Sequence, residues 1–246
     1  SLVSGGVAVG RLVNSAGSVL DSLDVFVPEG ANTSPGTVAA GGLAFRPIGV
    51  GSTSVRASIT GFKPIPPVTV TVSQPTITLP VDYLGSGLQR ARTVSTPGSI
   101  APAGGTPITL RTSQPGVVLL APNATTVGSD SLVVTIPEGA SSVGFTVQAL
   151  EGITADTITI TATSPGFATA VADQRVWAAV YTLNSLAATG TPLTADAPFV
   201  VSVGSPNSPA GTSIFSSDAR RFGAPPLVVS IRTTVPAVAL LAQTAG

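Results

Sequence analysis

The sequence predicts an all-β protein made of tandem antiparallel β-sandwiches. Three observations predict it: short segments alternate between apolar and hydroxyl-bearing residues, turn signals rich in Pro and Gly separate those segments, and the sequence repeats itself after roughly 105–110 residues. The chain has 246 residues and no Cys. The predicted sandwiches must therefore be held together by burial, without disulfides.

Four segments show the alternation clearly, and each is predicted to be a β-strand. They span residues 68–72, 143–147, 156–162 and 199–203. In the third of them, Ile158 and Ile160 alternate with threonines, so that one face is apolar and the other polar. This pattern is typical of a half-buried strand. We find no amphipathic helical stretch of useful length.

Turns are predicted between the strands, where Pro and Gly come close together. The signals are Pro28-Glu29-Gly30, Pro97-Gly98, Pro115-Gly116, Pro137-Glu138-Gly139 and Pro165-Gly166. Glu29 and Glu138 hold the same position in two of these turns. A polar residue between Pro and a Gly of positive φ suits a tight turn, so we interpret both as turn residues rather than as acids or ligands.

The internal repeat is the strongest long-range signal. The matching segments, with their offsets, are 21–30 with 130–139 (109), 60–62 with 165–167 (105), Thr78 with Thr182 (104), Ser95 with Ser202 (107), 108–112 with 229–233 (121) and 115–121 with 236–242 (121). The rise in offset from 107 to 121 implies that 14 residues are inserted in the last copy, around residues 213–226.

The repeat predicts three parts that are out of phase with the chain. Residues 1–73 are expected to hold the later strands of one repeat, residues 74–180 a complete repeat, and residues 181–246 the early strands of a third repeat with the insertion. Because the sequence contains no Met, we expect the chain to be an excised or internal part of a longer product.

A unit of this size with about seven short strands has the dimensions of an immunoglobulin-like sandwich. Its turn-and-strand motifs resemble the bacterial immunoglobulin-like (Big-type) repeats of large surface, adhesin and fibre proteins. The motifs that carry the resemblance are residues 113–117, 136–139 and 158–167. The resemblance implies Greek-key sandwiches that act outside the cell or at the cell surface as spacers, stalks, fibre subunits or adhesive modules.

Composition excludes several classes of function. The chain carries 11 Lys and Arg against 11 Asp and Glu, has one Lys, and lacks Cys, His and Met. Thiol and imidazole chemistry are impossible. Only a mechanism with paired carboxylates would remain, and no such pair stands out, so we predict no enzyme, no cofactor and no metal site. A neutral chain without a basic stripe is a poor nucleic-acid binder. No apolar run is long enough for a membrane span.

Other polar residues are interpreted as parts of the surface. Asp21 and Asp130 are equivalent, but neither belongs to a calcium-binding string, so we read them as turn or strand-start residues. Lys63 lies in a predicted hairpin turn, which argues against an isopeptide bond. Asn32 and Asn123 match the glycosylation sequon, which occurs often by chance in a chain rich in Ser and Thr.

The insertion is the one candidate interaction site. Phe215 and Phe222 flank Asp218, Arg220 and Arg221 in a chain that is otherwise almost free of charge. Loops at the ends of sandwiches commonly bind partners, and Arg and aromatic residues are enriched at interfaces. The alternative is a surface excursion that has no partner.

The favoured function is a structural subunit of an extracellular fibre, stalk or sheath, which associates with itself or with neighbouring repeats. The tail of one chain could complete the head of the next by strand complementation. Alternatively, both partial domains are completed within a longer chain. A second function is an adhesin or carbohydrate-binding module for a host or surface glycan or protein, with Tyr83, Trp177 and Tyr181 as candidate platforms.

Overall fold

The computed structural model describes residues 2–4, 8–80, 82–191, 194–235 and 241. The predicted all-β fold class is confirmed: within those ranges the only helix is a single 3-10 turn, η1 (Val38–Ala40). The chain divides into two compact units. Unit 1 comprises Ser1–Pro75 with Gly166–Ala168, and unit 2 comprises Thr76–Pro165 with Thr169–Gly246.

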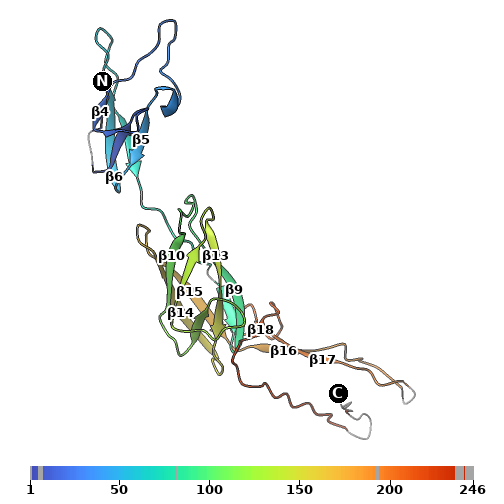
Figure 1. Cartoon of the computed structure of the whole chain (residues 1–246). Coiled ribbons are helices and arrows are strands. Elements are labelled where there is room, and N and C mark those ends of the chain that lie inside the picture. Colours follow the sequence, from blue (N-terminus) through green and yellow to red (C-terminus); the bar gives the residue numbers. More distant parts are fainter. Residues whose placement is uncertain (1, 5–7, 81, 192–193, 236–240, 242–246) are drawn as a thin grey trace. The chain divides into compact units, whose positions relative to one another are not determined.

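Unit 2 is built from two main sheets (Figure 1). The first has the order β12 (Ser131–Ile136), β10 (Thr106–Thr112), β14 (Ala155–Thr163), β15 (Ala170–Trp177) and β8 (Asp82–Gly85). The second has the order β11 (Val118–Ala121), β13 (Ser142–Ala149), β9 (Leu88–Ser95) and β18 (Ala219–Arg220). All pairs are antiparallel except β15 with β8, which run parallel.

Both sheets supply the core of unit 2, so they pack as the two layers of a β-sandwich. The predicted alternation is visible in β14, where Ile158, Ile160 and Ala162 are buried and the residues between them are not. Side chains less than 2% exposed come from the first sheet (Leu84, Ile108, Leu110, Ile136, Ile158, Val176) and from the second (Leu88, Val94, Val118, Leu120, Val147). Each such burial contributes about 1.5–3 kcal/mol.

The C-terminal part of unit 2 begins directly after the sandwich. Strand β15 ends at Trp177, and β16 (Val180–Asn184) starts three positions later and pairs with β17 (Val200–Gly204) in a two-stranded sheet. Residues 227–235 form no ladder. The predicted match over residues 236–242 lies outside the described residues except for Leu241.

Unit 1 also contains two sheets. One has the order β4 (Ser22–Leu23), β1 (Leu2–Ser4), β6 (Gly51–Ala57) and β7 (Val68–Val72); the other has the order β3 (Val19–Leu20), β2 (Gly10–Val13) and β5 (Ala44–Pro47). Its buried side chains are few, namely Leu12, Val13, Leu23 and Thr53 among the described residues. Residues 24–28, which the repeat matches with residues 133–137, form no ladder.

The strand order of unit 1 repeats part of that of unit 2. The sequence β4-β1-β6-β7 corresponds to β12-β10-β14-β15, and the pair β2-β5 corresponds to β11-β13. Leu2 faces Leu23 in the first case, and Leu110 faces Leu132 in the second. Among the described residues, unit 1 has no counterpart of β8 or β9.

The local predictions agree with this structure. Strand β7 has the predicted bounds, residues 143–147 and 156–162 lie inside β13 and β14, and residues 200–203 lie in β17. Gly30 and Gly139, which end the two Pro-Glu-Gly turns, have φ of +77° and +76°. The division into three parts and the Greek-key immunoglobulin-like topology stay predictions.

Candidate functional site

The inserted segment folds back onto the sandwich of unit 2. Its strand β18 adds to the free edge of β9, with Ala219 opposite Gln89 and Arg220 opposite Leu88. The backbone N–H of Arg221 then donates to the carbonyl of Gly87 at 3.0 Å. The residues predicted as an interaction loop therefore extend a sheet of their own unit.

A buried carboxylate fixes this segment. Asp218 has a side chain 5% exposed and accepts from the Arg90 guanidinium on β9, with Nε to Oδ1 at 2.6 Å and a second bond from Nη2 to Oδ2. The hydroxyl of Ser205 donates to the same carboxylate and accepts the backbone N–H of Gly85 at 2.6 Å. Paired bonds between ions are the strong and directional kind. Asp218 is thus held by Arg90 of β9 and by Ser205, which is itself fixed by Gly85 of β8.

A second arginine and a second carboxylate lie close to the Arg90–Asp218 pair. Arg90 and Arg92 are two positions apart and therefore point to the same side of the strand. Asp82, at the start of β8, lies 3.3 Å from Nη1 of Arg90 and 2.6 Å from Nη2 of Arg92. The hydrogen bond with Asp218 raises the pKa of Arg90, whereas burial lowers the pKa of Arg92. Two carboxylates thus balance two arginines.

Aromatic rings cover one side of this cluster. Tyr83 stacks on Trp177 with ring centroids 5.3 Å apart and planes 11° from parallel, and Phe215 meets the edge of Tyr83 at 5.8 Å. The Arg90 guanidinium lies 5.3 Å from the centre of the Tyr83 ring. Trp177 is only 8% exposed. The prediction that Trp177 is an exposed platform is therefore wrong, because its ring is used inside unit 2.

A second polar contact holds the end of the insertion. Arg221 donates to both oxygens of Glu151, with Nη2 to Oε2 at 2.7 Å, and Arg220 donates to the carbonyls of Gly87 and Pro225. Burial alone would raise the pKa of Glu151, but its hydrogen bond with Arg221 and the nearby positive charges hold that pKa below its ordinary value.

Two buried glutamines continue the network into the sandwich. Oε1 of Gln89 accepts from the backbone N–H of Phe222 and from Nε2 of Gln148, both at 3.0 Å. Gln148 is fully buried and also donates to the carbonyl of Thr126 at 2.8 Å. We call the contacts of residues 205 and 218–222 with β8, β9 and Glu151 the latch.

The five predicted site residues thus divide into two groups. Asp218, Arg220 and Arg221 bond within unit 2, while Phe215 and Phe222 remain 65% and 45% exposed. Their role as an interaction loop stays a prediction. The partners Asp82, Arg90 and Arg92 were not foreseen. The available signal was a pair of like charges two positions apart in a strand of a chain poor in charge.

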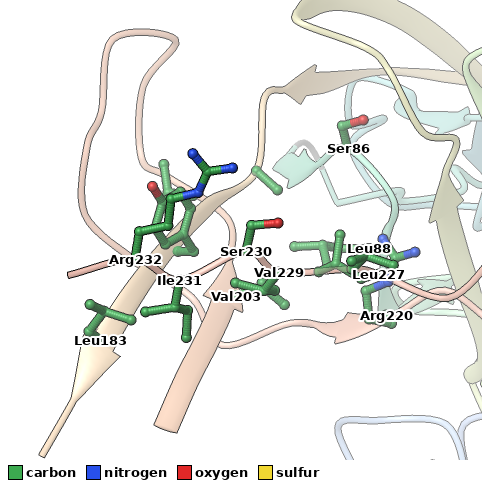
Figure 2. A pocket seen from close by; sticks show the side chains of 14 residues that line it. Ser86, Leu88, Leu183, Val203, Arg220, Leu227, Val229, Ser230, Ile231 and Arg232 are labelled. Carbon is green, nitrogen blue, oxygen red and sulfur yellow. The ribbon is translucent and has the colours of Figure 1, made fainter. Parts of the chain in front are cut away.

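A groove lined by both aliphatic and polar side chains lies beside the latch, with a volume of about 540 Å³. Its walls are the β16–β17 pair, residues 227–232 and the turn before β9 (Figure 2). Figure 2 shows Leu88, Leu227 and Arg220 at one end and Leu183 at the other. Val180, Val203, Val229 and Ile231 also line it. The strand pair and the segment that follows it therefore expose aliphatic side chains to a shared space.

The described residues offer little for other chemistry. They contain no group of three or more acidic side chains placed to hold a metal ion. None of their helices is long and apolar enough to cross a membrane. Lys63, Asn32 and Asn123 are exposed.

No protein-family model matches the sequence, and no curated protein matches it either. Among similar solved structures are domains 4 and 5 of the S-layer protein SbsC, with 17% identity and a TM-score of 0.29; the match covers 68% of this chain and 93% of that one. Domains 4–9 of SbsC match with 17% identity and a TM-score of 0.34, over 89% of this chain and 38% of that one. A β-glycosidase from Bacteroides vulgatus matches with 12% identity and a TM-score of 0.28, over 69% of this chain and 21% of that one. With TM-scores this low, these likenesses establish neither a family nor a function for the chain.

Proposed function

We propose that the chain is a non-catalytic structural part of an extracellular or cell-surface assembly, built from tandem immunoglobulin-like repeats joined stiffly end to end. The observation that carries this proposal is the latched junction after β15. Only Ala178 and Ala179 separate β15 from β16, and β18 returns from beyond β17 to pair with β9. A junction with a short connection and a second, buried tie resists bending.

The strand registers favour a repeat. Thr78 bridges Ser95 within unit 2, and Thr182 faces Ser202 in the β16–β17 pair. The sequence alignment matches Thr78 with Thr182 and Ser95 with Ser202 independently of this pairing. The strand pair at the C-terminal end of the described chain therefore has the register with which the central sandwich begins, as expected of a further copy.

The alternative function is an adhesin or glycan-binding module. Its platform would have to be Tyr181, which is 68% exposed and lines the groove. Trp177 is buried, and the ring of Tyr83 is stacked on Trp177 and covered at its edge by Phe215. A single exposed ring beside this groove is a small recognition surface for a sugar. We therefore favour the structural role.

Electron microscopy of native cells tests the proposal. Gold-labelled antibodies raised against the chain should decorate a regular surface layer or filaments, and the labelled material should show a repeat along its length. Labelling confined to the cell interior, or scattered label on material without order, contradicts the structural role. The alternative would be favoured if the labelled material had no regular order and if the chain bound a glycan that the Tyr181→Ala variant no longer binds.

A further inference from the structure

Strand β9 is held along one edge by two segments that lie far apart in the sequence. At its Ser95 end, Thr78 and Ser95 exchange two backbone hydrogen bonds, of 2.8 and 3.1 Å, in an antiparallel bridge. At its Leu88 end, β18 adds to the same edge, again antiparallel, with Arg220 opposite Leu88. The other edge of β9 pairs with β13 at seven positions. A segment that precedes the sandwich and a segment that follows it are therefore bonded to the same strand.

The two segments leave β9 in opposite directions. An antiparallel partner runs against its strand, so the residues before Thr78 continue beyond one end of β9 and the residues after Arg220 continue beyond the other. Arg221 is the first residue beyond β18, and its N–H donates to the carbonyl of Gly87 just outside β9. Tension between the chain ahead of Thr78 and the chain beyond the latch therefore acts along β9 and pulls at its two ends.

Force along a strand loads the latch in shear. The hydrogen bonds of an antiparallel pair are perpendicular to the strands, so a force along the strands loads them together instead of opening them one after another. The latch adds two charged contacts to its short ladder, namely Asp218 with Arg90 of β9 and Arg221 with Glu151. Bonds between charged groups are roughly twice as strong as neutral ones. The latch thus has the geometry and the chemistry to bear load.

The strands on either side of the latch differ in how firmly they are held. Leu88 and Val94 of β9 are 1% and 0% exposed, and both belong to the core of the sandwich. Strand β16 pairs with β17 at five positions, and none of its own residues is buried. A load that enters β9 is spread over the whole sandwich, whereas the same load on β16 would open a small and exposed pair.

We propose that the latch is a load-bearing tie, which passes tension from the chain beyond Phe222 directly into β9. The tension does not run through residues 178–217, because it leaves the backbone at residues 218–222. Strands β16 and β17 lie in this by-passed stretch. The inference rests on the proposed structural role, since a stalk, fibre or sheath is pulled along its length, and it adds the route by which the load crosses unit 2.

Stretching single molecules of the full chain tests this route, and the lack of Cys means that handles attach only at introduced thiols. In Gln74→Cys with Pro226→Cys, both at exposed positions, the force acts across the latch. Rupture of the latch should appear as a separate event before the sandwich unfolds, because its ladder has only two residues. The event should release residues 178–217, which add about 130–140 Å of contour length at roughly 3.3–3.6 Å per residue.

The matched control moves the second handle ahead of the by-passed stretch, as Gln74→Cys with Ala178→Cys. Ala178 is exposed and follows β15 directly, so this force does not load the latch and the first event should be absent. The later unfolding of the sandwich should remain, and it reports that the molecule was folded.

Two latch variants of the first pair measure what the charged contacts contribute. Asp218→Ala should shorten the lifetime of the first event at constant force by about tenfold or more, because a lost bond between charged groups lowers the barrier to rupture. Arg221→Gln should shorten it as well while leaving the Arg90–Asp218 pair in place. The later event should keep its force in both variants, since Arg90 has already lost Asp218 by then in the unaltered chain too.

Two results would overturn the inference. One is a gradual extension of residues 178–217 at low force, without a separate event. The other is a first event with the same lifetime in the unaltered latch and in both variants. A regular surface layer on native cells would still stand in either case. Conversely, the latch could bear load in a chain that proved not to form such a layer, so the two proposals fail separately.

Discussion

Arg90 on β9 and Asp218 beside β18 form a two-bond ion pair across 128 positions of sequence. Their side chains are 16% and 5% exposed. Each charge is therefore removed from most of its hydration and depends on the other for compensation. The pair is consequently the most sensitive point of the latch.

Replacing Asp218 by Ala should lower the free energy of unfolding of unit 2 by about 3 kcal/mol, because the substitution leaves Arg90 buried without its main partner. Urea unfolding followed by the fluorescence of Trp177 measures the loss. Asp196→Ala is the matched control, since Asp196 is exposed and its removal should cost less than about 0.5 kcal/mol. Equal effects of the two substitutions would show that the pair does not stabilise the latch.

The stacked rings give a second prediction. Trp177→Ala removes a buried ring that contacts Tyr83, so the free energy of unfolding should fall by about 3–5 kcal/mol. Circular dichroism must follow this unfolding, because the variant has no Trp left. Tyr181→Ala, at a position 68% exposed, should change stability by less than about 0.5 kcal/mol. A cost at Trp177 no larger than at Tyr181 would contradict the burial of the stack.

Gly204 allows the insertion to approach β17 closely. A Cβ atom at this position would lie 2.5 Å from the carbonyl oxygen of Ser216 and 2.6 Å from Cγ2 of Ile214. Gly204→Ala should therefore push residues 214–216 away and cost about 1–3 kcal/mol.

Hydrogen exchange is the measurement for this variant. The amides of β18 should exchange faster in Gly204→Ala while those of β14 keep their rates, because the displacement begins at the latch. Gly116→Ala is the control, since a Cβ there meets nothing within 4 Å. Unchanged exchange in β18 would mean that the segment tolerates the extra atom.

The Glu151–Arg221 contact predicts how stability depends on pH. The pKa of Glu151 is held below its ordinary value of 4.5 in the folded chain. A carboxylate with a lowered pKa stabilises the fold fully above its unfolded pKa, and this contribution disappears as the pH falls through the lower, folded pKa. Glu151→Gln should therefore reduce stability at neutral pH and make little difference in strong acid.

Urea midpoints of the two proteins, measured from neutral pH down to about pH 3, check this prediction. The gap between wild type and Glu151→Gln should be constant above the ordinary pKa of 4.5 and should narrow below it. Asp156→Asn is the control, because Asp156 is a carboxylate that takes no part in the latch. If the difference in urea midpoint widened in acid, the pKa of Glu151 would be raised rather than lowered in the folded chain, and its contact with Arg221 would not stabilise the latch.

Strands with a clear alternation of apolar and hydroxyl-bearing residues could be predicted from the sequence. Strand β7 follows its pattern of Val and Thr to the residue, although none of its side chains is fully buried. Strand β14, whose alternate side chains are buried, differs from its predicted bounds only at the ends. Both are long enough for the period of two to be visible, and both are bounded by turn residues. Residues 24–28 match part of β12 in sequence but form no ladder, so a sequence match alone does not carry a strand from one copy to the other.

The latch could not be predicted in this way. Strand β18 has two residues, too few for any period, and its partner β9 lies far back in the sequence. The unusual charges of the insertion drew attention to Asp218 and Arg221, but the choice of Arg90 and Glu151 as their partners depends on tertiary packing. Trp177 was misjudged for the same reason, since a large ring at a strand end can lie on either side of the surface.

Because Arg90 and Asp218 are far apart in the sequence, they are synthesised at different times. During synthesis at about 5–20 residues per second, the 128 positions between them take roughly 6 to 26 s to emerge. Throughout that interval the strands of the sandwich are available to fold, while the edge of β9 lacks its final neighbour and its arginine lacks its main counter-charge. The nascent protein thus passes through a stage with an unfinished, positively charged edge, which closes only when the next stretch of chain arrives.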